Sequence, residues 1–193
     1  MTVSLQKLLE STSPKLGNTL LIAIDGRGGS GKTTLAALLM KRFNAQLIQT
    51  DDFASWDNLY DWGSLITERV FEPIKNGATT LNYPRSKWWE NHQPEPVVDQ
   101  PVTKIMILEG VSSLRKEFRD YISIGIFVDT PREICLKRGM ERDINNDTGK
   151  TEAEITALWE KWAADEDKYI EREQPQEYAD IVIDGTKPLE EQL

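Results

Sequence analysis

A glycine-rich stretch near the amino terminus carries the clearest chemical signal in the sequence. Residues 26–33 read GRGGSGKT and match the phosphate-binding loop (P-loop) pattern G-x-x-x-x-G-K-[ST]. Glycines let the backbone bend tightly and aim its N–H groups inward, and a helix that starts at the loop adds the positive end of its dipole. The pattern predicts a polyphosphate site, with ATP and Mg²⁺ as expected ligands, formed by Gly26, Arg27, Gly28, Gly29, Ser30, Gly31, Lys32, Thr33 and Thr34.

Two side chains of this loop have specific expected roles. Lys32 is expected to reach the β- and γ-phosphates, and the Thr33 hydroxyl is expected to bind Mg²⁺. A glycine-rich turn without a ligand is the alternative. The apolar run before the loop and the amphipathic run after it favour the functional interpretation, because the motif requires a strand and a helix there.

Acidic residues follow two further apolar runs of the sequence. Asp51 and Asp52 come after QLIQ, and Glu109 ends KIMILE. Ligands of parallel α/β sheets bind beyond the carboxyl ends of the strands, so these acids are candidates for holding a metal and orienting an acceptor hydroxyl. Helix-capping or loop acids, and an ion-paired carboxylate at Glu109, are the alternatives. Asp25 also ends a strand, but it precedes the loop and is expected only to support the turn.

Short β-type runs alternate with longer helical runs, which predicts a parallel sheet wrapped by helices. Strands are expected at residues 19–25, 46–49, 104–109, 123–129 and 178–184, with a small edge strand at 79–83. Helices are expected at 4–10, 32–43, 131–144 and 151–172, and within 57–76, where Pro73 should shorten or bend the helix and Gly77 should end it. The expected fold is a three-layer α/β P-loop sandwich with a parallel sheet of about five strands, as one domain over residues 1–193.

Charge and cysteine content narrow the class of partner. The formal net charge is −9, and such a surface repels nucleic-acid phosphates. The single cysteine, Cys135, excludes an internal disulfide and is expected to be inert packing. With no signal peptide or membrane-length apolar run, we expect a soluble cytoplasmic protein without nucleic acid or membrane as partner; whether it forms a homo-oligomer stays open.

Five motifs in a fixed order give the sequence a specific resemblance. GRGGSGKT is followed by TDDF at 50–53, ILEG at 107–110, KRGMERD at 137–143 and YADIVI at 178–183. Together they resemble the uridine–cytidine kinase family, whose wider relatives include phosphoribulokinase and one type of pantothenate kinase. The likeness covers most of the chain, from about Thr19 to Asp184.

The resemblance implies roles for individual residues. Asp51 corresponds to the aspartate that accepts the proton of the acceptor hydroxyl and lies near the metal, and Glu109 to the glutamate that helps to position Mg²⁺. Arg138 and Arg142 fall on the arginine-bearing helix of a short lid, expected at about 138–151. Their i, i+4 spacing suits a clasp on the transferring phosphate, with surface pairing to Glu141 or to the acidic helix as the alternative.

The sequence departs from the family pattern in the lid and in the acceptor region. Family lids continue with further arginines, but here the segment reads INNDTGK, with Lys150 as the nearby cation. Nucleoside kinases of the family carry a tyrosine followed by a histidine that reads the pyrimidine. Here Tyr83 is followed by PRSKWWEN, and His92 lies further on. The acceptor region is expected within about 54–101, with Asp52, Tyr83, Arg85 and Trp88 as its candidate residues and Trp89 as an alternative to Trp88.

Other conspicuous side chains are interpreted as structural. Trp56 and Trp62 follow TDDF and could flank the acceptor, although packing is preferred for them, as it is for Trp159 and Trp162. The acidic residues 165–167 are expected to form a solvated face of the last long helix.

These observations favour an ATP-dependent phosphotransferase that acts on a hydroxyl of a small molecule. A nucleoside is preferred as the acceptor, ahead of a pantothenate-like alcohol or a sugar. A nucleotide-dependent switch or regulatory ATP-binding protein is the alternative from another class, although the sequence lacks the guanine-reading N-K-x-D segment of GTPases. A family member that has lost its activity is the third interpretation, favoured only by the arginine-poor lid.

Overall fold

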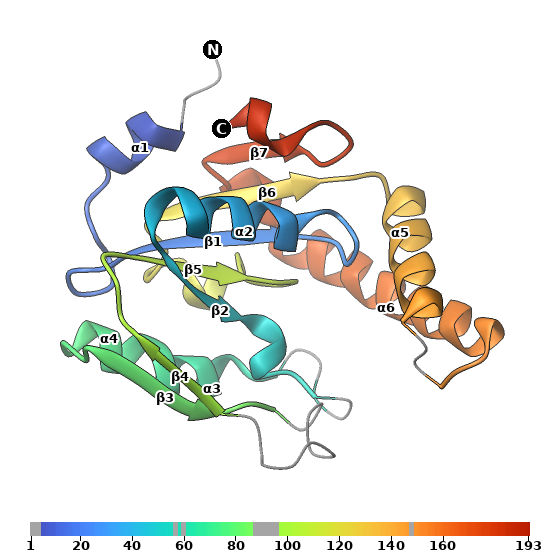
Figure 1. Ribbon diagram of the computed structural model, residues 1–193, viewed down its shortest axis with the longest axis horizontal. Helices are drawn as coiled ribbons and strands as arrows, with labels where there is room; N and C mark the ends of the chain where they lie inside the picture. The colour runs from blue at the N-terminus through green and yellow to red at the C-terminus, as the bar shows by residue number, and fades with distance from the viewer. Residues whose placement is uncertain (1–4, 56–57, 59–60, 87–96, 147–148) are drawn as a thin grey trace.

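A five-stranded parallel sheet forms the centre of the computed structural model, which describes residues 5–55, 58, 61–86, 97–146 and 149–193 (Figure 1). The strand order is β2-β5-β1-β6-β7. The strands are β1 (Leu20–Gly26), β2 (Gln46–Gln49), β5 (Ile105–Glu109), β6 (Ile124–Asp129) and β7 (Ile181–Asp184). Glu109 is in register with Gln49 on one side and with Ile24 on the other. The end of β5 therefore lies between the ends of β1 and β2, where the P-loop and Asp51 follow.

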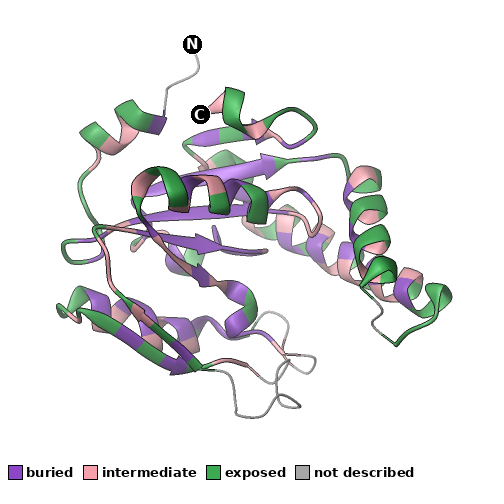
Figure 2. Ribbon diagram, viewed as in Figure 1, coloured by how far each residue is buried: buried purple, intermediate pink, exposed green. Residues whose placement is uncertain are grey.

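Helices cover both faces of this sheet and give three layers. Side chains of β1 alternate between two cores: Leu21 and Ala23 join one cluster, and Ile22 and Ile24 join the other. Helix α2 (Lys32–Phe43) and helix α1 (Leu5–Ser11) pack on the second cluster, and α2 lies in front of the sheet in Figure 1. Both faces of the central strands β1, β5 and β6 are consequently buried, as expected for a parallel sheet (Figure 2). The predicted three-layer α/β fold is confirmed.

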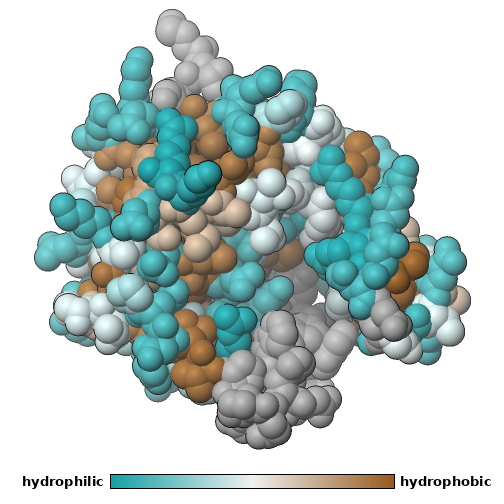
Figure 3. Space-filling view, viewed as in Figure 1, coloured by the Kyte–Doolittle hydropathy of each residue, from teal (hydrophilic) through white to brown (hydrophobic). Residues whose placement is uncertain are grey.

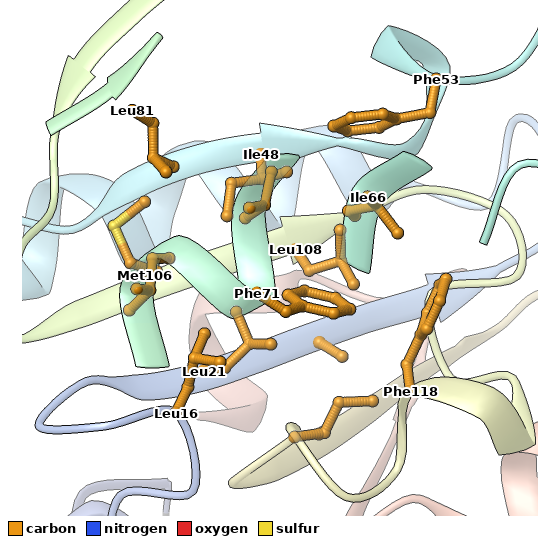
Figure 4. Packing of buried hydrophobic residues seen from close by; sticks show 14 of the residues in the cluster. Leu16, Leu21, Ile48, Phe53, Ile66, Phe71, Leu81, Met106, Leu108 and Phe118 are labelled. Carbon is orange, nitrogen blue, oxygen red and sulfur yellow. The ribbon is translucent and has the colours of Figure 1, made fainter. Parts of the chain in front are cut away.

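The opposite face of the sheet is covered by a helix that changes its winding. Helix α3 (Gly63–Ile66), a π-helical turn (Thr67–Phe71) and α4 (Glu72–Lys75) follow one another directly. Pro73 lacks the N–H of a regular helical bond, and the wide turn just before it lets the chain continue as a helix to Lys75. Figure 4 shows Ile66 and Phe71 packed with Phe118 and strand residues of this core.

A β-hairpin accounts for the small strand predicted at 79–83. Strand β3 (Thr80–Pro84) pairs antiparallel with β4 (Val97–Pro101), and the two form a sheet of their own. We did not predict β4, whose sequence VVDQP is short and ends in proline. Gln100 Nε2 donates to the carbonyl of Leu47 over 2.9 Å, so the hairpin is tied to the edge strand β2.

Two long helices form the lobe at the right of Figure 1. Helix α5 (Arg132–Asn145) follows β6, and α6 (Glu152–Glu173) returns toward the sheet. Thr151 starts α6 with a capping box, because its hydroxyl accepts from the Glu154 N–H while the Glu154 carboxylate accepts from the Thr151 N–H. Short helical elements complete the chain, namely η1 (Thr50–Asp52), η4 (Lys116–Phe118), α7 (Pro175–Tyr178) and η5 (Leu189–Gln192). Among the described residues, no helix has the length and apolar character needed to cross a membrane.

Candidate functional site

The P-loop joins β1 to α2 and has the backbone geometry that only glycine adopts readily. Gly26, Gly29 and Gly31 have φ angles of 144°, 79° and 108°. Lys32 is only 6% exposed, and its Nζ donates to the carbonyl of Arg27 over 2.8 Å. Lys32 starts helix α2, and its ammonium group folds back over the P-loop to Arg27. The positive charge at the helix start suits the loop to an anionic ligand.

Asp25, which directly precedes the P-loop, holds the start of the loop by hydrogen bonds. Its buried carboxylate accepts four hydrogen bonds, from the N–H groups of Gly26, Ser112 and Leu114 and from the Tyr169 hydroxyl, at 2.7, 3.1, 2.8 and 2.6 Å. Burial raises the pKa of Asp25, and the hydrogen bonds from Tyr169, Leu114 and Gly26 together with the charge of Lys32 act against this. The expected supporting role of Asp25 agrees with these contacts, which join the P-loop, the loop after β5 and helix α6.

The candidate metal ligands come together at the carboxyl edge of the sheet. Thr33 Oγ1 lies 3.3 Å from Glu109 Oε1. Glu109 is 5% exposed; burial raises its pKa, Lys32 opposes the shift and the negative charge of Asp51 adds to it. Thr33, Asp51 and Glu109 offer oxygen donors, the type that Mg²⁺ prefers, and Mg²⁺ needs few protein ligands when a nucleotide supplies others. Within the described ranges, no group of three or more His, Cys, Asp or Glu side chains forms a metal cluster.

Asp51 lies in η1, beside these groups. The residue is exposed, but the protein around its carboxylate reduces solvation and thereby raises its pKa, while the positive charges of Lys32 and Arg142 lower it. The backbone carbonyl of Asp51 accepts from the Ser86 hydroxyl over 3.1 Å, which connects it to the segment after β3. Asp51 is thus an accessible carboxylate with cations nearby that favour its ionised form.

The structure brings together three of the four candidate acceptor residues. The carboxylate of Asp52 is buried, with the Tyr83 hydroxyl 3.4 Å from Oδ2 and Arg85 Nη1 3.3 Å from Oδ1. Burial raises the pKa of Asp52, and Arg85 is the strongest opposing influence. Trp88, the fourth candidate, lies outside the described residues, as do Trp89, His92 and Trp56.

Aromatic side chains support this group from the core. Phe53 packs against Tyr83 and Trp62, with ring centroids 5.1 and 6.2 Å apart. Trp62 is 1% exposed and belongs to the core cluster, so the preferred packing interpretation is confirmed for it.

The two lid arginines on α5 point to different neighbours. Arg138 Nη1 donates to the carbonyl of Gly185, after β7, over 3.0 Å. Arg142 bonds the adjacent Asp143 at 2.9 Å and lies 5.5 Å above the Trp159 ring, yet it is close enough to influence the pKa of Asp51. Both residues are exposed, and Arg142 is the one of the two whose charge lowers the pKa of Asp51. The surface of Figure 3 is hollowed between the α5 lobe and the body of the molecule.

Our interpretation of residues 165–167 as a solvated face is wrong for Glu166. This residue is 7% exposed, and its Oε1 accepts from the Gly28 N–H over 2.8 Å. The neighbouring Asp167 binds Arg27 at 2.6 Å and Arg132 at 3.3 Å, whereas the half-buried Asp165 pairs with the exposed Lys168. A sequence signal was present, because Glu166 is seven residues after Trp159 and continues the apolar stripe of the helix.

Packing explains the other conspicuous residues of the lobe. Trp159 is 4% exposed and donates from Nε1 to Asp143 over 2.8 Å, which ties α6 to α5. Cys135 is buried, and burial raises the pKa of its thiol to about 11, so it is unreactive near neutral pH. The expectations of packing at Trp159 and Cys135 are confirmed.

Two hollows of the surface lie in different places relative to the candidate site residues. One of about 270 Å³ lies at the amino-terminal end of the sheet, lined by residues that include Gly17, Lys75 and Lys104. Another of about 150 Å³ borders Arg27 and Thr130. The larger hollow contains none of the candidate site residues, so we place the functional site by its side chains at the carboxyl edge.

Similarity to known proteins agrees with this geometry. Residues 66–188, more than half of the chain, match the model of the phosphoribulokinase/uridine kinase family. The chain is 27% identical over 187 residues to a uridine kinase of Pectobacterium carotovorum subsp. carotovorum, covering 85% of this chain and 86% of that protein. It is 26% identical, with the same coverage, to a uridine kinase of Escherichia coli K12.

A solved structure supports the fold. The structure of a possible uridine kinase from Bacillus stearothermophilus covers 87% of this chain, which in turn covers 89% of that one, with a TM-score of 0.61 and 23% identity. At this identity the likeness concerns the fold. On the match to the family model, with the fold and the relatives in agreement, this chain belongs to the phosphoribulokinase/uridine kinase family.

Proposed function

We propose that this protein is an ATP- and Mg²⁺-dependent kinase that transfers the γ-phosphoryl group to a hydroxyl of a small molecule, with a nucleoside as the preferred acceptor. The observation that carries the proposal is the grouping of Lys32, Thr33, Glu109 and Asp51 at one edge of the sheet, with a hydrogen bond between Thr33 and Glu109. Membership of a kinase family and the named uridine kinases among its relatives support it.

In this proposal the P-loop residues hold the nucleotide. Backbone N–H groups between Gly26 and Thr34, with the positive end of the α2 dipole, bind the phosphates, and the Lys32 ammonium neutralises the β- and γ-phosphates. Thr33, Asp51 and Glu109 would hold Mg²⁺. When bound, this ion supplies neutralisation of the charge on the phosphate oxygens.

Asp51 would act on the acceptor. Its carboxylate orients the acceptor hydroxyl and takes up the hydroxyl proton as the oxygen forms its bond to the γ-phosphorus, while the bond from this phosphorus to the ADP oxygen breaks. Arg142, which acts electrostatically on Asp51, would stabilise the transferring charge. Arg138 is assigned the same role on the strength of the family resemblance, and its bond to Gly185 would have to break for it to reach the phosphate.

The acceptor is expected to contact Asp52, Tyr83 and Arg85, with Trp88 as the candidate from the segment outside the described residues. A buried carboxylate with a tyrosine hydroxyl and a guanidinium around it can bind a polyhydroxylated molecule through several hydrogen bonds. This supports a nucleoside first, and after it a pantothenate-like alcohol or a sugar. The net charge of −9 fits a small-molecule acceptor better than a nucleic acid, and the cytoplasm is the expected compartment.

The test is ADP formation from MgATP with a panel of nucleosides, vitamins and sugars. The controls are a reaction without acceptor and the Lys32→Ala variant. We expect one acceptor class to stimulate ADP formation, and the variant to lose this stimulation. ADP formation that is slow and equal with every acceptor would contradict the proposal and favour a nucleotide-dependent switch.

A further inference from the structure

Helix α6 reaches the P-loop through a buried carboxylate. Glu166 Oε1 accepts from the Gly28 N–H over 2.8 Å, although the two residues are 138 positions apart in the sequence. The Glu166 side chain is 9% exposed and stands in the middle of a 22-residue helix. A buried carboxylate is retained where it has partners, and this one has its shortest hydrogen bond to the backbone of the loop.

The absence of a side chain at Gly28 leaves room for this contact. Gly26, Gly29 and Gly31 need glycine for their positive φ angles, but Gly28 has no such angle. A Cβ atom at Gly28 would instead lie 3.0 Å from the Trp159 ring and 3.1 Å from Glu166 Oε1. A side chain at position 28 would therefore require Trp159 and Glu166 to move by a few tenths of an ångström, because helix α6 packs directly on the loop backbone there.

Positively charged side chains compensate the negative charge of the Glu166 carboxylate. Arg27 Nη1 lies 4.0 Å from Glu166 Oε2 and 2.6 Å from Asp167 Oδ1, and Arg132 Nε lies 3.3 Å from the other oxygen of Asp167. Two arginines thus face two acids across the P-loop, α5 and α6. With its charge compensated on the Oε2 side, Glu166 can keep Oε1 on the Gly28 N–H.

We propose that Glu166 is a positioning residue for nucleotide binding: it fixes the Gly28 peptide from helix α6 and so sets the shape of the P-loop that receives MgATP. The inference rests on the nucleotide-binding part of the proposed function. Helix α6 follows the lid segment, so the same bond makes the placement of the lobe and the shape of the loop depend on each other.

The test compares three variants at position 166 by calorimetric titration with MgATP in the absence of any acceptor. Glu166→Gln keeps a carbonyl oxygen at the same distance, whereas Glu166→Ala removes it and Glu166→Asp draws it back by one methylene group. We expect the alanine and aspartate variants to bind MgATP about tenfold more weakly, the size of one hydrogen bond to a charged group, and the glutamine variant to stay within about threefold of the wild type. Asp165→Asn, an equal change of charge on a surface acid of the same helix, is the matched control and should bind as the wild type does.

Two results of this titration would contradict the role proposed for Glu166. An alanine variant that binds MgATP as tightly as the wild type, or more tightly, would overturn the proposal, and so would a glutamine variant as weak as alanine. If the alanine variant does not fold, the comparison of aspartate with glutamine takes its place. In turnover with the stimulating acceptor, the defect should appear in the KM for ATP and leave the KM for the acceptor unchanged. A wild-type protein that fails to bind MgATP would overturn both this inference and the proposed function, whereas normal binding by all variants would overturn the inference alone.

Discussion

Thr33 and Glu109 are 76 residues apart in the chain, and the hydroxyl of one lies 3.3 Å from the carboxylate of the other. The bond connects the first turn of α2, directly after the P-loop, with the end of β5. Because β5 lies between β1 and β2, Asp51 after β2 adds its negative charge to the same place and raises the pKa of Glu109 further than burial alone does. Two acids and a hydroxyl close to Lys32 therefore share one place at this edge of the sheet.

Replacement of Glu109 by glutamine should stabilise the protein without metal and impair its activity. The pKa of Glu109 in the folded protein is raised above the ordinary 4.5, so folding favours the protonated form. The stability that this gives is complete below the ordinary pKa and is lost as the pH rises through the raised value. At pH 7 the neutral Glu109→Gln side chain avoids this loss, and we expect an increase of about 1 kcal/mol, or roughly 2–4 °C in Tm.

The measurement is thermal unfolding at pH 7 with a chelator, followed by activity over a range of Mg²⁺ concentrations. We expect the variant to need more Mg²⁺ than the wild type for half-maximal activity. A lower Tm in the presence of chelator would show that the ionised carboxylate stabilises the fold, against this account.

The acid limb of the pH–rate profile should depend on Arg142 and be independent of Arg138. Reduced solvation raises the pKa of Asp51, and the charge of Arg142 lowers it, whereas Arg138 is held at Gly185. Asp51 must be ionised to accept a proton, so activity rises as the pH passes its pKa from below. Arg142→Gln removes an opposing cation and should shift the acid limb to higher pH.

The profile of kcat/KM for ATP reports the free enzyme and is the quantity to measure. Arg138→Gln is the matched control: its rate can fall, but the position of its acid limb should stay where the wild type has it. If both variants shift the acid limb equally, the pH of the limb responds to any loss of positive charge. The specific influence of Arg142 on Asp51 would then be contradicted.

The hydrogen bond from Tyr169 to Asp25 should contribute more to stability than an ordinary tyrosine bond. The Tyr169 hydroxyl donates to a buried carboxylate over 2.6 Å, and the Tyr178 hydroxyl donates to the backbone carbonyl of Arg119 over 3.0 Å. Hydrogen bonds to charged groups contribute about 1.5–3 kcal/mol and neutral ones about 0.5–1.5 kcal/mol. In urea unfolding, Tyr169→Phe should therefore destabilise the protein more than Tyr178→Phe. Equal losses would indicate that Asp25 is satisfied by its backbone donors alone.

An alanine at Gly139 should separate the two helices of the lobe. A Cβ atom there would collide with the six-membered ring of Trp159, which is buried and tied to Asp143. Overpacking costs about 1–3 kcal/mol, and a collision with a buried ring belongs to the upper part of this range, above the gain of about 1 kcal/mol in helix propensity when glycine becomes alanine. We expect Gly139→Ala to lower the free energy of unfolding. The exposed Glu141→Ala on the same helix should change it by about 0.5 kcal/mol at most, and a stabilised Gly139→Ala would contradict the packing seen at Trp159.

The sequence was sufficient to predict the central sheet and the edge at which the site forms. Apolar runs such as TLLIAID and KIMILE coincide with β1 and β5, and GRGGSGKT with the turn between β1 and α2. Because parallel strands end at one edge, Thr33, Asp51 and Glu109 could be expected together before their positions were known.

Features that depend on tertiary contacts could not be predicted in this way. Strand β4 is a short segment with little pattern of its own, and it becomes a strand by pairing with β3. The i, i+4 spacing put Arg138 and Arg142 on one face of α5, but Gly185 and Trp159 draw them to different neighbours. The acidic run around Glu166 predicts a solvent-exposed side chain. The packing of α6 on Gly28 buries it instead.

The most direct test of the account is mass spectrometry of the acceptor after incubation with MgATP, for the wild type and for Asp51→Asn. We expect the wild type to convert a nucleoside, or another acceptor of the panel, into its phosphate ester in step with ADP formation. We also expect Asp51→Asn to bind ATP, measured with EDTA present because Asp51 is a proposed Mg²⁺ ligand, but to form little ester. Release of ADP and free phosphate by the wild type, with every acceptor left unmodified, would contradict the central claim that this site transfers a phosphoryl group to a hydroxyl.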